Sequence, residues 1–311
     1  TIIADAIHLG TTADKISTTG SIVLKPTTTS RTVGIGDSAT GDFSLTAAEI
    51  AALTGYSSLT IGASGNTGAV DINNITFEAN TTIYGGAMAL DTITATNHNV
   101  TLSATGAVTD ATADTTDNFA LGNGVLTMST TSGNIGATDD GRIDINTTGQ
   151  INITNEVNSA YIYINSKAAT TDLGTIAMYA AGPPPVRGRF DITSAGSISQ
   201  SGAISTGYTY INAAGTVDLS TQDNNVFYLG PVTAGGDFSW NNGNNILLTY
   251  GAIDTSGSNG AITFDVGTST FSNPSNQSIS AGSGTITIIA DAIHLGTTAD
   301  KISTTGSIVL K

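Results

Sequence analysis

The sequence TIIADAIHLGTTADKISTTGSIVLK at residues 1–25 is repeated without a change at residues 287–311. An identity of this length does not arise by chance, and exact internal repetition is typical of proteins built as arrays of one structural unit. We therefore interpret residues 1–286 as one repeat unit and residues 287–311 as the start of the next identical repeat. An artificial duplication of the segment is the alternative explanation.

One local pattern recurs along the rest of the chain, namely a short stretch of alternating apolar residues that begins after Gly or Asn. Alternation with a period of two places one set of side chains inward and the other outward, as in a β-strand. The intervening Gly, Asn, Asp, Thr and Ser favour turns. The instances are GSIVL from residue 20, GAVDI from 68, NVTLSA from 99, GVLTM from 124, GRIDI from 141, GQINI from 149, GTIAM from 174, GRFDI from 188, GTVDL from 215, GAITF from 260 and GTITI from 284.

The spacing of these strands distinguishes a sandwich from a solenoid. Antiparallel sandwiches need hairpin turns, for which Asn-Gly is the strongest signal, and this dipeptide is scarce here. Where strands can be aligned, as for GTITI from residue 284 and GSIVL from residue 306, they are about 22 residues apart. We predict an all-β parallel β-helix (β-solenoid) with about 22 residues per coil, forming an open-ended tandem repeat. At about 4.8 Å per coil, a unit of about 13 coils would advance roughly 60 Å along a rod.

Two segments depart from the strand pattern. LTAAEIAAL at residues 45–53 predicts a short helix, in which Thr46 and Glu49 form a capping box and Gly55 closes the end. GPPPVRGRF at residues 182–190 predicts a protruding loop, because three consecutive prolines cannot donate hydrogen bonds to a strand ladder.

Composition restricts the partners and the source of stability. The net charge is −15, with 24 acidic residues against nine basic ones. Nucleic acid and anionic membranes need a basic surface, so neither is expected as a partner. The sequence contains no run of about 18 apolar residues, so no membrane-spanning segment is predicted. Because the chain contains no Cys, we expect stacked strands rather than disulfides to stabilise it.

Few residues are arranged for metal binding or catalysis. His8, His98 and His294 form no H-x-x-H pattern, so no transition-metal site is predicted. Two acidic clusters are interpreted as turn-forming residues, with weak Ca²⁺ binding as the second interpretation; they are Asp110, Asp114 and Asp117, and Asp139, Asp140 and Asp144. We expect no other cofactor.

An enzyme is the least favoured class of function. Solenoids that cleave polysaccharides need paired carboxylates, or a bound cation beside Lys and Arg, within one groove. The basic residues of this chain are spread thinly over its length. We therefore predict that the chain is not an enzyme, with a polysaccharide-active β-helix as the third candidate.

Tyrosines form a more suggestive pattern. YIYIN at residues 161–165 recurs as YTYIN at residues 208–212, which is 47 residues or about two coils later. An outward strip of rings would stack on sugars or on another fibre, whereas an inward strip would fill the core of a wider section. The candidate contact residues for a ligand or partner are Tyr161, Tyr163, Tyr208, Tyr210, Arg187 and Arg189.

Two runs near the N-terminus, GSIVLKPTTTSRTVGIG from residue 20 and FSLTAAEIAALTGYSSLTIG from residue 43, carry a family resemblance. They resemble the coils of large bacterial exoproteins of the filamentous haemagglutinin type, most clearly over residues 1–70 and 284–311. The resemblance implies a right-handed parallel β-helix, secretion through an outer-membrane pore partner and an extracellular location at the bacterial cell surface. It also implies a role in adhesion, or in spacing an adhesin from the cell.

We therefore expect a structural segment of a long extracellular repeat fibre, the stalk of an adhesin that mediates cell or surface attachment. The alternative is a carbohydrate-binding face along the solenoid. The partners expected are further copies of the same repeat end to end, with surface glycans or another cell as the attachment target.

Overall fold

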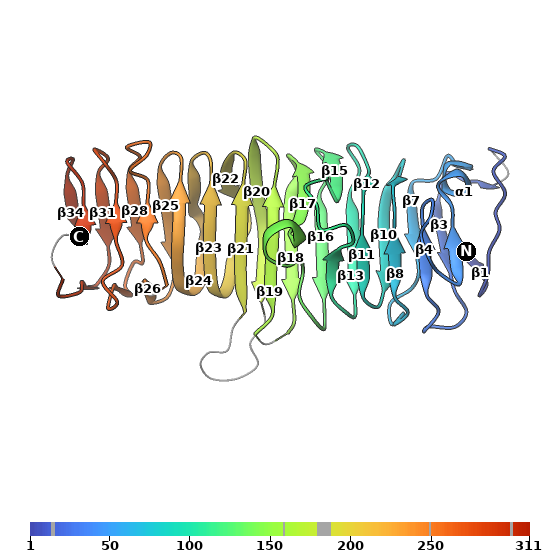
Figure 1. The fold of residues 1–311 in the computed structure, drawn as a ribbon, viewed down its shortest axis with the longest axis horizontal. Coiled ribbons are helices and arrows are strands. Elements are labelled where there is room, and N and C mark those ends of the chain that lie inside the picture. The colour runs from blue at the N-terminus through green and yellow to red at the C-terminus, as the bar shows by residue number, and fades with distance from the viewer. Residues whose placement is uncertain (14–15, 158, 179–187, 249, 299–300) are drawn as a thin grey trace. The chain divides into compact units, whose positions relative to one another are not determined.

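The computed structural model describes residues 1–311 except 14–15, 158, 179–187, 249 and 299–300 (Figure 1). The chain divides into two compact units, Thr1–Val157 and Asn158–Lys311. Stacked parallel strands form a β-solenoid of about 13 turns with roughly 22 residues per turn. The prediction of an all-β parallel solenoid is therefore confirmed.

In the unit Thr1–Val157, three ladders of parallel strands run through successive coils. The first contains β3 (Ser21–Lys25), β7 (Ser58–Ile61), β10 (Asn80–Gly85), β13 (Val100–Ala104), β16 (Leu126–Thr130) and β18 (Gln150–Asn155). The second contains β5 (Phe43–Leu45), β4 (Val33–Ile35), β8 (Val70–Ile72), β11 (Met88–Leu90) and β14 (Val108–Asp110). The third contains β9 (Ile75–Thr76), β12 (Ile93–Thr94), β15 (Phe119–Gly122) and β17 (Ile143–Thr147). The unit also contains β1 (Ile2–Ile3), β2 (Ile16–Ser17), β6 (Leu53–Thr54), α1 (Ala47–Ala51) and the 3₁₀ turn η1 (Asp139–Gly141).

The unit Asn158–Lys311 is built in the same way, and its longest strands turn corners and join two ladders. One ladder contains β19 (Tyr161–Ser166), β21 (Arg189–Ser194), β23 (Ile204–Ala213) and β24 (Val217–Ala234). Another contains β20 (Thr170–Met178), β22 (Ser197–Gln200), β24, β25 (Phe238–Asn242), β28 (Ile262–Asp265), β31 (Ile286–Ile289) and β34 (Ile308–Leu310). Two further ladders continue from β24. One contains β26 (Ile246–Leu248), β29 (Thr270–Ser272) and β32 (Ala292–His294), and the other contains β27 (Ile253–Asp254), β30 (Ile279–Ser280) and β33 (Ile302–Ser303).

The core of each unit consists of apolar side chains stacked in register from coil to coil. In the first unit the fully buried stack is Leu24, Ile61, Ile83, Leu102, Met128 and Ile153. In the second it is Leu219, Trp240, Phe264 and Ile288. Each of the Gly- or Asn-initiated patterns predicted from the sequence contains a strand. Alternation therefore identified the strands correctly, because one residue in two had to enter this interior.

Glycines precede many strands because the coils approach closely at the corners. A Cβ atom added to Gly68 would lie 1.8 Å from the carbonyl oxygen of Arg31. Gly36 combines such an approach, 1.7 Å from the carbonyl oxygen of Asn73, with a φ of +102°. Any other residue at these corners would push neighbouring coils apart.

The helix and the proline-rich segment differ from the predictions at their ends. The capping box of Thr46 and Glu49 is present, but α1 is shorter than residues 45–53. Leu45 pairs with Ile35 and Leu53 pairs with Ile16. Strand pairing thus satisfies the backbone groups of Leu45 and Leu53, and this outcompetes further helical turns.

Among the described residues no helix has the length and apolar character needed to cross a membrane.

Residues 182–187 of the predicted loop lie outside the described residues. The prediction is wrong for Arg189 and Phe190, which belong to β21. Phe190 is fully buried in the core, so its apolar side chain holds this end of the segment in the wall.

Candidate functional site

The predicted tyrosines belong to β19 and β23, two strands of the ladder formed by β19, β21, β23 and β24 (Figure 1). Tyr161, Arg189, Tyr208 and Tyr228 occupy equivalent positions on these four strands. The alternate residues Ile162, Ile164, Phe190 and Ile192 are fully buried. The tyrosines therefore point outward, and the interpretation that they fill the core is wrong. The six residues Tyr161, Tyr163, Tyr208, Tyr210, Tyr228 and Tyr250 are called the tyrosine face below.

Three tyrosines form one group of rings. Tyr208 stacks on Tyr228 with ring centroids 4.8 Å apart. The ring of Tyr250 meets both edge-on, with centroids 5.1 Å from that of Tyr208 and 5.6 Å from that of Tyr228. Offset and edge-on contacts are the favourable geometries for aromatic pairs. This group covers part of the outer wall with rigid rings.

A second group surrounds Arg189. Its guanidinium lies between two rings, 5.0 Å from the centroid of Tyr163 and 4.3 Å from that of Tyr210. Arg189 Nη2 donates to Asp191 Oδ2 over 2.5 Å. Tyr161 stacks on Tyr163 with centroids 5.6 Å apart. Cation–π contacts and a charge-assisted bond thus hold the arginine flat against the wall.

Burial sets the protonation of the phenols. Desolvation raises the pKa of Tyr208 to about 12, and a hydrogen bond with Tyr250 adds to the rise. Burial also raises the pKa of Tyr210, against the opposing effect of the Arg189 charge. The raised pKa values keep the phenols of Tyr208 and Tyr210 protonated at physiological pH.

The arrangement is suited to stacking and hydrogen bonding. Tyr161 is 41% exposed and Tyr250 is 52% exposed, so two rings remain open to solvent. Aromatic rings with polar ends bind partners that have both an apolar and a hydroxylated surface, such as sugars. The buried ring of Tyr163 and the half-buried ring of Tyr208 support the exposed ones.

Not all predicted site residues come together. Tyr161, Tyr163, Tyr210 and Arg189 form one group, whereas Tyr208 packs in the other. Arg187 lies outside the described residues. Asp191, Tyr228 and Tyr250 were not predicted; Tyr228 lies one coil after Tyr208 and a search at coil spacing finds it. Tyr250 follows Tyr228 by 22 residues, so the same search finds it as well.

The first acidic cluster acts in part within turns, since Asp110 Oδ1 accepts from the backbone N–H and the hydroxyl of Thr112, and Asp114 Oδ1 accepts from the N–H of Thr116. Asp117 Oδ2 instead accepts from Asn146 Nδ2, 29 residues away. In the second cluster Asp139 and Asp140 lie in the turn η1, but the turn interpretation is wrong for Asp144, which is buried in β17. In the part of the chain that the structure describes, no three His, Cys, Asp or Glu residues are grouped as metal ligands. Weak Ca²⁺ binding stays a prediction.

Comparison with known families gives a match over a segment that includes Arg189, Tyr208 and Tyr210. Residues 164–227 match DUF5649, a family of repeats of unknown function. No curated protein and no solved structure matches the chain. The DUF5649 segment begins within β19, includes β21 and β23, and ends within β24. The match and the parallel coils agree with a repeat-containing β-helix protein.

Proposed function

We propose that this chain is a structural segment of a long extracellular fibre, the stalk of a bacterial adhesin of the filamentous haemagglutinin type. The observation that supports this is that both copies of the repeated segment pair their first strand residues with their last in the same register. Ile2 pairs with Leu24 in the first copy, and the equivalent Ile288 pairs with Leu310 in the second. The backbone N–H of Ala4 donates to Lys25 O over 3.2 Å, and that of Ala290 donates to Lys311 O over 3.0 Å.

The two copies also show how one coil accepts neighbours on both sides. In the first copy, Leu24 pairs with Ile61 of the coil that follows. In the second copy, Ile288 pairs with Phe264 of the coil that precedes. Because the two copies have the same sequence, a single coil is compatible with both neighbours. One unit of residues 1–286 can therefore continue directly into another, as a stalk requires.

The remaining parts of the proposal rest on composition and resemblance. A net charge of −15 keeps neighbouring fibres apart and opposes binding to nucleic acid. The resemblance of residues 1–70 to exoprotein coils supports secretion through an outer-membrane pore and a location at the cell surface. We propose further copies of the repeat as end-to-end partners, another cell or its glycans as the target, and no enzymatic activity.

Tandem chains with one, two and four copies of residues 1–286 should gain the same length for each added copy. Electron microscopy should show thin rods that lengthen by roughly 60 Å for each added unit, because about 13 coils stack at about 4.8 Å. A string of separate globules would contradict the proposal. A matched control carries a flexible Gly/Ser linker between residues 286 and 287, and we expect a bend at each linker.

The exposed rings of the tyrosine face favour a second candidate function, the binding of carbohydrate. Tyr161→Ala combined with Tyr250→Ala removes the two exposed rings and leaves the buried and half-buried ones in place. If each ring contributes about 1 kcal/mol, glycan binding on an array should weaken about tenfold or more. Tyr84→Ala is the control, because Tyr84 lies on the outer side of β10 in the other unit. Equal binding by both variants, or no glycan bound by the unmodified chain, would exclude this function.

A further inference from the structure

We propose that the tyrosine face binds an uncharged, β-linked polysaccharide lengthwise, with the sugar chain running in the direction in which the coils stack and about one sugar over each coil. The inference deepens the carbohydrate-binding function proposed above and rests on it, because it assigns the class of sugar and the direction in which the chain lies. The ligand is a stretch of several sugars, and a short oligosaccharide fills only part of the site.

The rings lie one behind the other along the ladder. Four residues share one register position on successive strands, namely Tyr161 of β19, Arg189 of β21, Tyr208 of β23 and Tyr228 of β24. Tyr250 follows β26, the strand that pairs next with β24. Four steps of about 4.8 Å, or roughly 19 Å, therefore separate the coils of the two exposed rings, Tyr161 and Tyr250. Only an elongated ligand can contact both.

The step between coils matches the step between sugars. A polysaccharide of β-linked hexoses with equatorial linkages is nearly straight, and each sugar advances it by a length close to the strand spacing of about 4.8 Å. Each sugar carries C–H groups on its flat faces and hydroxyls around its rim. The flat face packs on an aromatic ring, and the rim meets the polar end of a tyrosine. A chain aligned with the coils can therefore stack on Tyr161 and on Tyr250 at the same time.

The exposed rings are held in place before a ligand binds. Tyr161 stacks on Tyr163 with 15° between the ring planes, and the guanidinium of Arg189 lies 5.0 Å from the centroid of Tyr163. At the other end of the face, the ring of Tyr250 meets that of Tyr208 at 75°. Side chains that are already held lose little conformational entropy on binding. The stacking energy of the two exposed rings is therefore available for the sugar chain.

The charges favour an uncharged sugar chain. The guanidinium of Arg189 donates to Asp191, so the positive charge within the face is already paired with a carboxylate. Burial raises the pKa of Tyr208 to about 12, and this phenol therefore adds no charge at physiological pH. The whole chain has a net charge of −15, which repels anionic polysaccharides. An uncharged polysaccharide binds without this repulsion.

A length series tests the direction of binding in the full chain. Cellobiose, cellotetraose and cellohexaose are uncharged β-linked chains of two, four and six glucose units, and isothermal titration calorimetry measures the Kd of each. Cellohexaose is long enough to contact both exposed rings, whereas cellobiose reaches one. We expect cellohexaose to bind at least about fivefold more tightly than cellobiose. The hexamer of cellouronic acid, which has a carboxylate on each sugar, should bind at least about fivefold more weakly than cellohexaose.

Two single substitutions decide whether the sugar chain lies along the coils or across them. Tyr161→Ala and Tyr250→Ala each leave one exposed ring. Either should weaken cellohexaose binding about fivefold but cellobiose binding no more than about twofold, because cellobiose needs only one ring. Tyr84→Ala, in β10 of the other unit, should change neither. If only one of the two substitutions weakened cellohexaose binding, the chain would lie across the coils and the proposal would be wrong.

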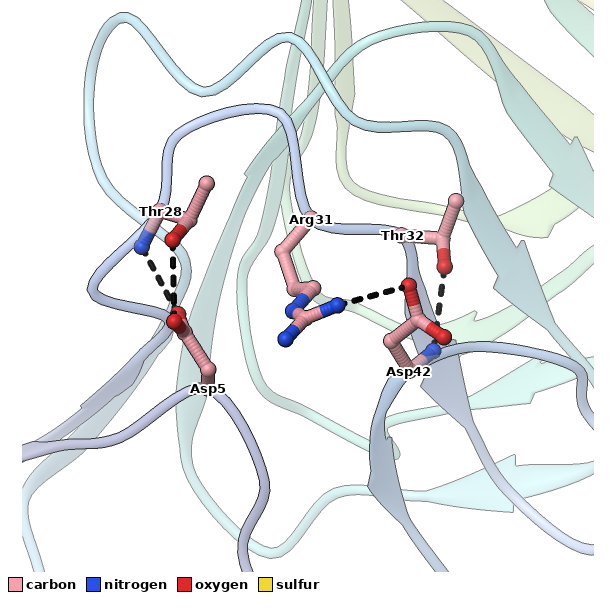
Figure 2. Close-up of polar contacts among 5 residues, drawn as sticks. All are labelled: Asp5, Thr28, Arg31, Thr32 and Asp42. Carbon is pink, nitrogen blue, oxygen red and sulfur yellow. Dashed lines mark hydrogen bonds and ion pairs between the residues drawn. The ribbon is translucent and has the colours of Figure 1, made fainter.

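Arg189 is a positioning residue in this site, since its planar group supports Tyr163 and, through it, Tyr161. Arg189→Lys keeps the positive charge but loses the flat guanidinium between the rings. We expect it to reduce the preference for cellohexaose over cellobiose at least about twofold. Arg31→Lys is the matched control, because Figure 2 shows Arg31 paired with Asp42, with Nη1 donating to Oδ2 over 3.3 Å. Equal preferences in the two variants would remove Arg189 from the site.

The outcomes separate this inference from the function on which it rests. Equal affinities for cellobiose and cellohexaose would overturn lengthwise binding and leave the carbohydrate-binding function in place. Binding of none of the three would also overturn the inference, and the glycan array then decides whether another carbohydrate is bound. Sedimentation that shows self-association through Tyr161 and Tyr250, with no sugar bound, would overturn the proposal and assign the face to a second copy of the chain.

Discussion

Replacing Asn224 with leucine is expected to lower the free energy of unfolding by about 3–5 kcal/mol, because several buried polar groups lose their partners together. Asn224 is buried at a corner of β24 and its side chain bonds five groups. Its Nδ2 donates to Leu219 O, Asn241 O and Gln200 Oε1, and its Oδ1 accepts from Ile204 N and Gln200 Nε2. Leucine has a similar volume and can form none of these bonds.

The measurement is urea unfolding followed by circular dichroism. Asn244→Leu is the matched control, since Asn244 is exposed and its amide donates only to Asn225 Oδ1 among the bonds described. A surface change of this kind should stay within about 0.5 kcal/mol. Equal effects of the two substitutions would show that the hydrogen bonds of the Asn224 side chain contribute little to the free energy of unfolding.

Replacing Trp240 with alanine should cost about 3–5 kcal/mol, the range for emptying the site of a buried aromatic ring. Trp240 is fully buried, in register with Leu219 and Phe264, and its ring centroid lies 6.4 Å from that of Phe238. It is the single tryptophan of the chain, so the variant lacks tryptophan fluorescence and its unfolding in urea is followed by circular dichroism.

Trp240→Phe is the informative comparison. The indole N–H is buried and donates to no acceptor among the described residues. Phenylalanine removes this unsatisfied donor while it keeps most of the apolar surface, so we expect a loss of less than about 1.5 kcal/mol. A cost for Trp240→Phe as large as that for Trp240→Ala would mean that ring shape, and not burial, determines the stability of this stack.

The strands and their parallel stacking could be predicted from sequence because inward residues must be apolar at every second position. The predicted alignment of residues 284 and 306 is confirmed by the pairing of Ile286 with Ile308. Coil length could not be predicted where it varies. The coil after Ser21 closes only at Ser58, because β5, α1 and β6 follow β4 before the chain returns to the first ladder.

The tyrosine face shows a second limit of sequence patterns. In YIYIN both sets of alternating residues are apolar enough to enter a core, so alternation alone does not identify the inward set. The neighbouring strand decides it, because Phe190 pairs with Ile162 and is buried while Arg189 pairs with Tyr161. The charge of Arg189 excludes its column from the interior. The two-coil separation of Tyr161 and Tyr208, by contrast, is confirmed, since both pair with Arg189.

The junction formed by residues 1–25 and 287–311 has a consequence for heredity. A gain or loss of 286 codons by unequal recombination between the stretches that encode these identical segments would give every coil a neighbour that it already has. A gain or loss of any other size would set unfamiliar strands against each other, with mismatched apolar stacks and corner bonds. In the proposed fibre, selection for a longer or shorter reach would therefore act in whole units of roughly 60 Å.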